Sequence, residues 1–145
     1  MPLSVAQLRD AVSSQISSIS GYRQMLMIPE YFSRTPNTLA HKAYSVGVDV
    51  SNAQPERQRR AVGLVLESVV RVRIAYRIRP HDILTDYNAA LDAESVVVGK
   101  ILSSYATIRD GVSIRFIRSN RSAPDSSEYL ISDIEFAAIH TLSFS

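Results

Sequence analysis

The sequence predicts an α+β fold: a mixed or antiparallel four-stranded sheet with two main helices packed on one face. Two segments repeat apolar residues every few positions, which is typical of amphipathic helices. Four other segments alternate apolar and polar residues, which is typical of half-buried strands. These segments follow one another in the order helix, two strands, helix, two strands. Pairs of strands separated by single helices favour two layers, with the helices on one side of a sheet.

The first predicted helix covers residues 3–18 and starts near Pro2. Ser20 and Gly21 are suited to end it, because glycine readily adopts the backbone conformation that terminates helices. Its apolar positions are Leu3, Val5, Leu8, Val12, Ile16 and Ile19. Residues 21–37 contain two prolines and show no clear period, so we expect an irregular segment over the core there.

Two strands are predicted next, over residues 39–50 and 64–79. The first should place on one face Tyr44, Val46, Val48 and Val50. The second contains the stretch RVRIAYRIRP, so one of its faces is apolar and the other is cationic. The cationic face carries Arg71, Arg73, Arg77 and Arg79. The polar stretch between the strands predicts a mobile loop or a hairpin arm at about 51–63, with its tip extending from the body.

A second helix is predicted over residues 83–104. Pro80 ends the preceding strand because proline has no N–H to donate to the sheet, and Asp82 or Thr85 can cap the first helical turn. The apolar stripe of this helix is interrupted by Glu94 and consists of Tyr87, Leu91, Val98, Ile101, Leu102 and Tyr105. Acidic residues gather in its first half, where the helix dipole favours negative charge.

Two further strands complete the predicted sheet. The third covers residues 112–118, after a turn at Asp110 and Gly111, and directs inward Val112, Ile114 and Phe116. The last covers residues 129–145 and carries on one face Ile134, Phe136, Ala138, Leu142 and Phe144. The two predicted halves share the order helix, strand, strand.

Length and composition predict one domain over residues 1–145, because 145 residues with 46% hydrophobic content can bury one normal core. The 16 basic and 14 acidic residues nearly cancel, which does not favour a dedicated nucleic-acid binder. The absence of cysteine excludes disulfides, thiolate zinc sites and a cysteine nucleophile. No apolar stretch approaches the roughly 20 residues of a membrane helix, so no membrane partner is expected.

No catalytic, cofactor-binding or metal-binding residue is expected, and an enzyme is the least favoured class. The three histidines show no ligand spacing, and motifs such as GxSxG, GxGxxG and the Walker loop are missing. His81, Asp82 and Asp86 could in principle form an oxygen-rich metal site. A helix cap with acids matched to the helix dipole explains the same residues more simply.

The most distinctive feature is the uneven placement of charge. Residues 55–80 contain seven arginines and two glutamates, whereas residues 82–110 contain five acids and two basic residues. Segments of opposite charge are expected to pack against each other or against copies of the same chain, and a cationic face could also meet DNA. The interface candidates are Arg57, Arg59, Arg60, Arg71, Arg73, Arg77 and Arg79, with Asp82, Asp86, Asp92 and Glu94 as possible complements.

The layout of four segments resembles a known family. They are HKAYSVGVDV, VVRVRIAYRIRP, DILTDYNAALDAESVVVGKIL and YLISDIEFAAIHTLSFS, with a proline-containing, arginine-rich loop between the first two. This order is similar to that of the tail terminator, or tail-completion, proteins of long-tailed bacteriophages. The likeness covers about residues 3–144 and rests on order and texture, including the helical sequence YNAALDAE at residues 87–94.

The resemblance implies a structural virion protein that is assembled in the host cytoplasm and located in the tail or neck. Such a protein forms a ring, commonly a hexamer, which caps the tail tube, stops its polymerisation and offers a surface to the head-tail connector proteins. Nonspecific DNA contact in the ring lumen is compatible with the arginines. The alternatives are another head-tail connector, completion or tail-tube protein, and a small arginine-rich nucleic-acid-binding module.

Overall fold

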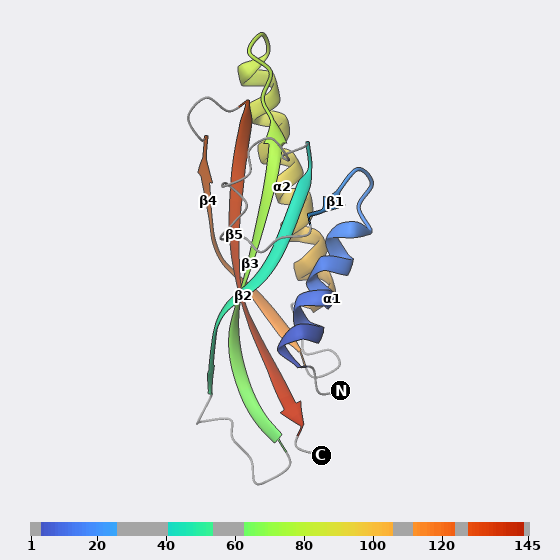
Figure 1. Cartoon of the computed structure of the whole chain (residues 1–145), viewed down its shortest axis with the longest axis vertical. Helices are drawn as coiled ribbons and strands as arrows, with labels where there is room; N and C mark the ends of the chain where they lie inside the picture. Colours follow the sequence, from blue (N-terminus) through green and yellow to red (C-terminus); the bar gives the residue numbers. More distant parts are fainter. Residues whose placement is uncertain (1–3, 26–40, 54–62, 106–111, 124–127, 144–145) are drawn as a thin grey trace.

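The structure, a computed structural model, describes residues 4–25, 41–53, 63–105, 112–123 and 128–143. Its elements, drawn in Figure 1, are α1 Val5–Ser17, β1 Arg23–Gln24, β2 Ala43–Ala53, β3 Gly63–Arg77, α2 Ile83–Tyr105, β4 Ser113–Ser122 and β5 Tyr129–Ser143. The predicted α+β class is confirmed. The described sheet has five strands and not four, because the short β1 pairs in parallel with the start of β2.

The strands lie in the order β1-β2-β3-β5-β4. All pairs except β1 with β2 are antiparallel, so the sheet is mixed. The centre of the sheet consists of β3 and β5, which pair in one continuous register from Gly63 opposite Ser143 to Arg77 opposite Tyr129. A strand from the middle of the sequence and the last described strand therefore form the longest pairing of the sheet.

Both helices pack on the same face of the sheet, as predicted (Figure 1). A capping box starts α1, because the Ser4 hydroxyl accepts the Gln7 N–H and the Gln7 side chain accepts the Ser4 N–H. The core between helices and sheet includes Leu8, Val12, Ile16, Val72, Ile74, Val97, Ile101, Ile134 and Phe136. We call this face of the sheet the helix face and the opposite one, on which neither described helix packs, the open face.

The buried stripe of α2 differs from the predicted one. Ala90, Val97 and Ile101 face the core, whereas Tyr87 is 39% exposed. Glu94, which was expected to interrupt the stripe, is itself buried at 4% exposure. The helix therefore buries a carboxylate within its apolar side, and that carboxylate requires a partner.

Two expected core positions are wrong for reasons of strand geometry. A bulge between Val48 and Val50 shifts the register, so Val50 is 47% exposed instead of sharing a buried face with Val48. Phe116 is 41% exposed because β4 lies at the sheet edge, although its ring packs edge-on against Phe136. Phe144 lies outside the described residues.

The connection expected at about 51–63 begins and ends within strands. Residues 51–53 are the last of β2, and Gly63 is the first of β3, with Ala53 paired opposite Leu66. Residues 54–62 lie outside the described residues, so the character of the tip stays a prediction. The described strands show an antiparallel pair that points toward that connection (Figure 1).

Candidate interface site

The arginines in the middle of β3 lie on the open face and contact acids of the same chain. The Arg71 Nε donates to the Asp133 Oδ1 at 2.8 Å, and the Arg73 Nε donates to the Asp133 Oδ2 at 3.2 Å. The Arg71 Nη1 also lies 3.7 Å from the Asp49 Oδ2. One carboxylate on β5 thus bridges two arginines on β3, and one of these arginines also reaches β2.

The sheet register explains this arrangement. Arg73 pairs directly opposite Asp133, and Arg71 pairs opposite Glu135, one step along the same face of β5. Burial raises the pKa of Asp133, but the hydrogen bonds and positive charges of Arg71 and Arg73 outweigh it and lower the pKa overall. Asp133 is therefore a carboxylate that the two arginines hold in its charged form.

Further ion pairs extend this pattern across the open face. The Arg118 Nε lies 3.1 Å from Glu135, and the Arg115 Nη2 lies 3.8 Å from Glu67. We call the ion pairs on this face the open-face network, which also includes the pair between Arg77 and Glu128. It joins five arginines to five carboxylates: Arg71, Arg73, Arg77, Arg115 and Arg118 with Asp49, Glu67, Glu128, Asp133 and Glu135. The charges within this network cancel.

Arg79 and the start of α2 form a separate cluster. The Asp86 Oδ2 accepts the Arg79 backbone N–H at 2.8 Å and its Nε–H at 3.0 Å. Asp82 lies 3.6 Å from the same guanidinium. The hydrogen bonds from Arg79 lower the pKa of Asp86 to about 2. Two of the acids expected to meet a neighbouring subunit therefore contact an arginine of their own chain.

Glu94 has an intramolecular role as well. Its carboxylate accepts hydrogen bonds from the Arg121 guanidinium and from the Ser119 hydroxyl on β4, the latter at 3.1 Å. The hydrogen bond to Glu94 raises the pKa of Arg121. This pair fastens the middle of α2 to the edge strand. Asp92, in contrast, lies on an exposed position of α2.

Sequence reasoning thus found the arginine face but missed its acidic partners. Asp133 and Glu135 alternate on the last strand as the arginines do on β3, and that shared spacing was the available signal. Arg57, Arg59 and Arg60 lie outside the described residues, so their role as interface residues stays a prediction.

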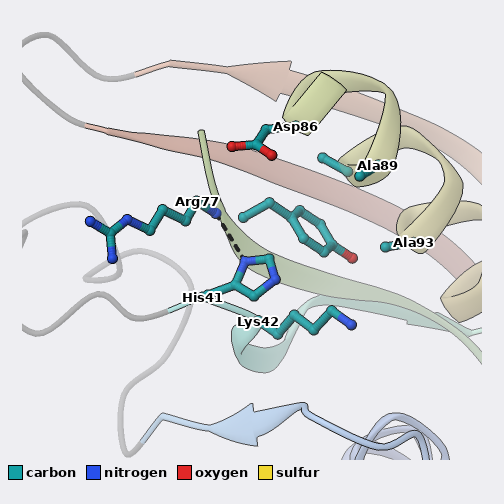
Figure 2. Close-up of a pocket in the computed structure, with 8 residues that line it drawn as sticks. His41, Lys42, Arg77, Asp86, Ala89 and Ala93 are labelled. Carbon is teal, nitrogen blue, oxygen red and sulfur yellow. Dashed lines mark hydrogen bonds between the residues drawn. The ribbon is translucent and has the colours of Figure 1, made fainter. Parts of the chain in front are cut away.

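A cavity of about 180 Å³ lies where β2, β3 and α2 meet, and Figure 2 shows its lining. The lining residues are His41, Lys42, Tyr76, Arg77, Asp86, Ala89, Ala90 and Ala93. The His41 Nδ1 accepts the Arg77 backbone N–H at 3.1 Å, while the Arg77 side chain points away from the imidazole ring. Burial lowers the pKa of His41, and the charge of Lys42 lowers it further. This cavity therefore has a neutral imidazole as one wall and small alanines as another.

Two further polar groups are buried in the sheet. The Ser68 hydroxyl lies 2.7 Å from the His140 Nε2 and 2.7 Å from the Ser51 hydroxyl, so a hydrogen-bonded chain links β2, β3 and β5. Ser68 and His140 are fully buried. Among the described residues, no cluster of three or more histidines or acids is arranged to hold a metal ion, and His81, Asp82 and Asp86 form no such group.

Comparison with known proteins gives no indication of the function. No protein-family model matches the chain, and no curated protein matches it. Within the described part of the chain, neither helix is long and apolar enough to cross a membrane. The arrangement of charge on the open face is therefore the main observation on which a function can be argued.

Proposed function

We propose that the protein is a structural subunit of a long-tailed phage virion, a tail terminator that assembles into a ring in the host cytoplasm. The ring, expected to be a hexamer, caps the tail tube, stops its polymerisation and provides the surface that joins the tail to the head. Its partners are other copies of the chain, the tail-tube protein and the head-tail connector proteins. The proposal involves no chemical reaction.

The observation that carries this proposal is the open-face network. Its arginines are held at set positions by carboxylates on neighbouring strands, so the face presents fixed charges of both signs. Fixed, alternating charges favour a protein partner of matching geometry, because each wrong register places like charges opposite one another. A network whose charges cancel gives little general attraction for phosphate.

Two carboxylates of α2 also support a structural role. Glu94 holds α2 to β4 through Arg121, and Asp86 holds the start of α2 to the end of β3 through Arg79. These carboxylates are engaged as acceptors of several hydrogen bonds each. Groups used in this way stiffen the junctions between elements, which suits a subunit that must keep its shape in an assembly.

One observation favours a weaker contact with DNA as an additional role. The side chains of Arg77, the last residue of β3, and Arg79, just after it, are 56% and 59% exposed although each has an acidic neighbour. Exposed arginines at one end of the molecule could face the lumen of a ring through which DNA passes. Such contact would be nonspecific and would weaken steeply with salt.

Native mass measured over a range of protein and salt concentrations tests the ring. We expect a discrete closed species near a hexamer of the 16.1 kDa chain, about 97 kDa. A chain that stays monomeric at every concentration would contradict the proposed ring. Tight binding of duplex or single-stranded nucleic acid by that monomer would instead favour the nucleic-acid-binding module.

A second assay separates a tail terminator from a neighbouring connector or tube protein. Purified tail-tube protein from a matching phage is allowed to polymerise with and without this protein, and tube lengths are measured by electron microscopy. A terminator should shorten the tubes and appear at one end of each. A tube protein would instead be incorporated along the length, and a connector would leave the length distribution unchanged.

A further inference from the structure

Exposed strand segments lie at both edges of the sheet. In β2 the residues from Asp49 to the end of the strand are all exposed. In β4, seven of the ten residues are exposed, two are half-buried, and Ile114 is buried. Exposed sheet edges present N–H and C=O groups to which another strand can add.

Each edge is covered only in part by described residues. β1 pairs with Ala43 and Tyr44 alone, and the Arg9 Nε donates to the Val46 carbonyl at 2.7 Å. The second half of β2 has no described neighbour on that side, and β4 pairs only with β5 among the described strands. Within the described part of the chain, the sheet therefore has two edges with no strand on their outer side: the second half of β2 and β4.

The directions of these edges are compatible with one another. The strands β2, β3, β5 and β4 are successively antiparallel, so β2 and β4 run in opposite directions. If a second copy with the same orientation is placed beside the first, its β2 lies antiparallel to β4. The two edges also lie at the same height along the strands. Val50 pairs with Val69, Val69 pairs with Ala137, and Ala137 pairs with Arg115, so one row across the sheet joins Val50 to Arg115.

The two edges are also complementary in charge. β4 contains three arginines and no acid, whereas β2 contains Asp49 and no basic residue. Charged side chains commonly block strand addition, but each β4 arginine forms an ion pair with an acid of its own chain, on β3, β5 or α2. Apolar side chains remain exposed on both edges, with Val50 at 47% and Ile117 at 38%.

We propose that copies of this chain join edge to edge, with β4 of one copy against the second half of β2 in the next. This inference rests on the proposed self-assembly and names the surface that produces it. The contact is heterologous, so the same two edges are used at every junction and a ring closes when the last copy meets the first. The sheet becomes continuous around the ring, and Val50 lies near Ile117 of the neighbouring copy.

Single-cysteine variants test this contact, and they are easily made because the natural chain contains no cysteine. Val50→Cys and Ile117→Cys are purified separately, mixed, and treated with a short thiol-to-thiol cross-linker. We expect covalent dimers that contain one chain of each variant. Either variant alone should give few dimers, because each has a cysteine on only one edge.

Val96→Cys is the matched control, since Val96 is 57% exposed but lies on α2 and on neither edge. It should cross-link with neither variant. Dimers of Val50→Cys with itself would overturn the proposed pairing in favour of a symmetric contact. If the wild-type chain forms a closed oligomer and the mixed variants do not cross-link, the edge pairing is wrong while the ring stands. A monomeric wild type overturns both.

A charge variant provides a second measurement. Ile117→Glu places a carboxylate near Asp49 of the neighbouring copy, and we expect the concentration for half-assembly to rise about tenfold or more. Val96→Glu is the control and should leave that concentration unchanged. Equal circular dichroism and equal denaturation midpoints will show that both variants fold. Unchanged assembly by a folded Ile117→Glu variant contradicts the proposal.

Discussion

The two faces of β3 are held in place by different physical forces. On the helix face, Val70, Val72, Ile74 and Tyr76 are at most 1% exposed and belong to the main core. On the open face, the side chains of Arg71 and Arg73 are 23% and 18% exposed and are held by Asp133. The comparison teaches that an alternating pattern predicts two unlike faces, but does not show whether the polar face meets water, a partner or its own chain.

The difference between the two faces decides which arginines can be assigned to a surface that binds another molecule. A strand with arginines at alternate positions has the charge pattern of a binding site for an anion. In this chain the antiparallel register brings an acidic strand beside it, so Arg71 and Arg73 stabilise the sheet. Among the described arginines that form ion pairs, those with most exposure lie at or just after the end of β3 and on β4, and those are better placed to meet another molecule.

The largest effect is expected on the helix face. Ile74→Ala removes a fully buried side chain from the main core and leaves a cavity beside β3. We expect the free energy of unfolding to fall by about 3 kcal/mol, which urea denaturation can measure. Val96→Ala on the exposed side of α2 is the control, and its effect should stay within about 0.5 kcal/mol. Similar losses for both would mean that Ile74 is not packed as described.

A smaller effect is expected on the open face. Asp133→Asn keeps the shape of the side chain but removes the charge that two arginines share, and these side chains are partly buried. We expect a loss of about 1.5 kcal/mol in the free energy of unfolding, less than for a fully buried pair. The control is Glu128→Gln, because Glu128 is 52% exposed in its pair with Arg77, and its effect should be below about 0.5 kcal/mol.

The same variant distinguishes an internal network from a partner site. If Asp133→Asn is as stable as the wild type but no longer assembles, then Arg71 and Arg73 require Asp133 mainly to meet a neighbour. If stability falls and the remaining folded protein still assembles, the network serves the sheet itself. Native mass and urea denaturation on one sample give both results.

Most of the fold could be predicted because its elements are long and regular. The helices and the four long strands each contain enough residues for a period to be recognised. β1 could not, since two residues show no period. The exposure of Val50 could not be predicted either, because a bulge adds one residue to the strand without a residue type that marks it.

The sequence predicted the arginines of the candidate site but not their acidic partners. The arginines were identified because they are repeated in one strand, whereas their partners lie about 60 residues away in the sequence and become neighbours only through the register of β3 with β5. Glu94 was expected to interrupt the apolar stripe of α2, and its burial was not predicted. Its partner Arg121 was not predicted either, because nothing in the local sequence of β4 distinguishes that arginine from Arg115 or Arg118.

The smallest effect is expected just after β3, where the Arg79 side chain is 59% exposed in its ion pair with Asp86, and it should be detected as a pH dependence. The pKa of Asp86 is lowered from 3.8 to about 2 in the folded chain, so the unfolded chain binds its proton at a higher pH than the folded chain does. Asp86 therefore contributes stability above pH 3.8, and this contribution is lost as the pH falls toward about 2.

We expect Asp86→Asn to be less stable than the wild type at neutral pH, and the two free energies of unfolding to converge as the pH falls through that window. Asp82→Asn is the matched control, because Asp82 contacts the same guanidinium at the longer distance of 3.6 Å, and it should change stability less at neutral pH. Urea denaturation at a series of pH values measures all three proteins. A difference between wild type and Asp86→Asn that stays constant down to about pH 2 would mean that Arg79 does not hold Asp86 in its charged form, and the exposed end of β3 would then be available to a partner.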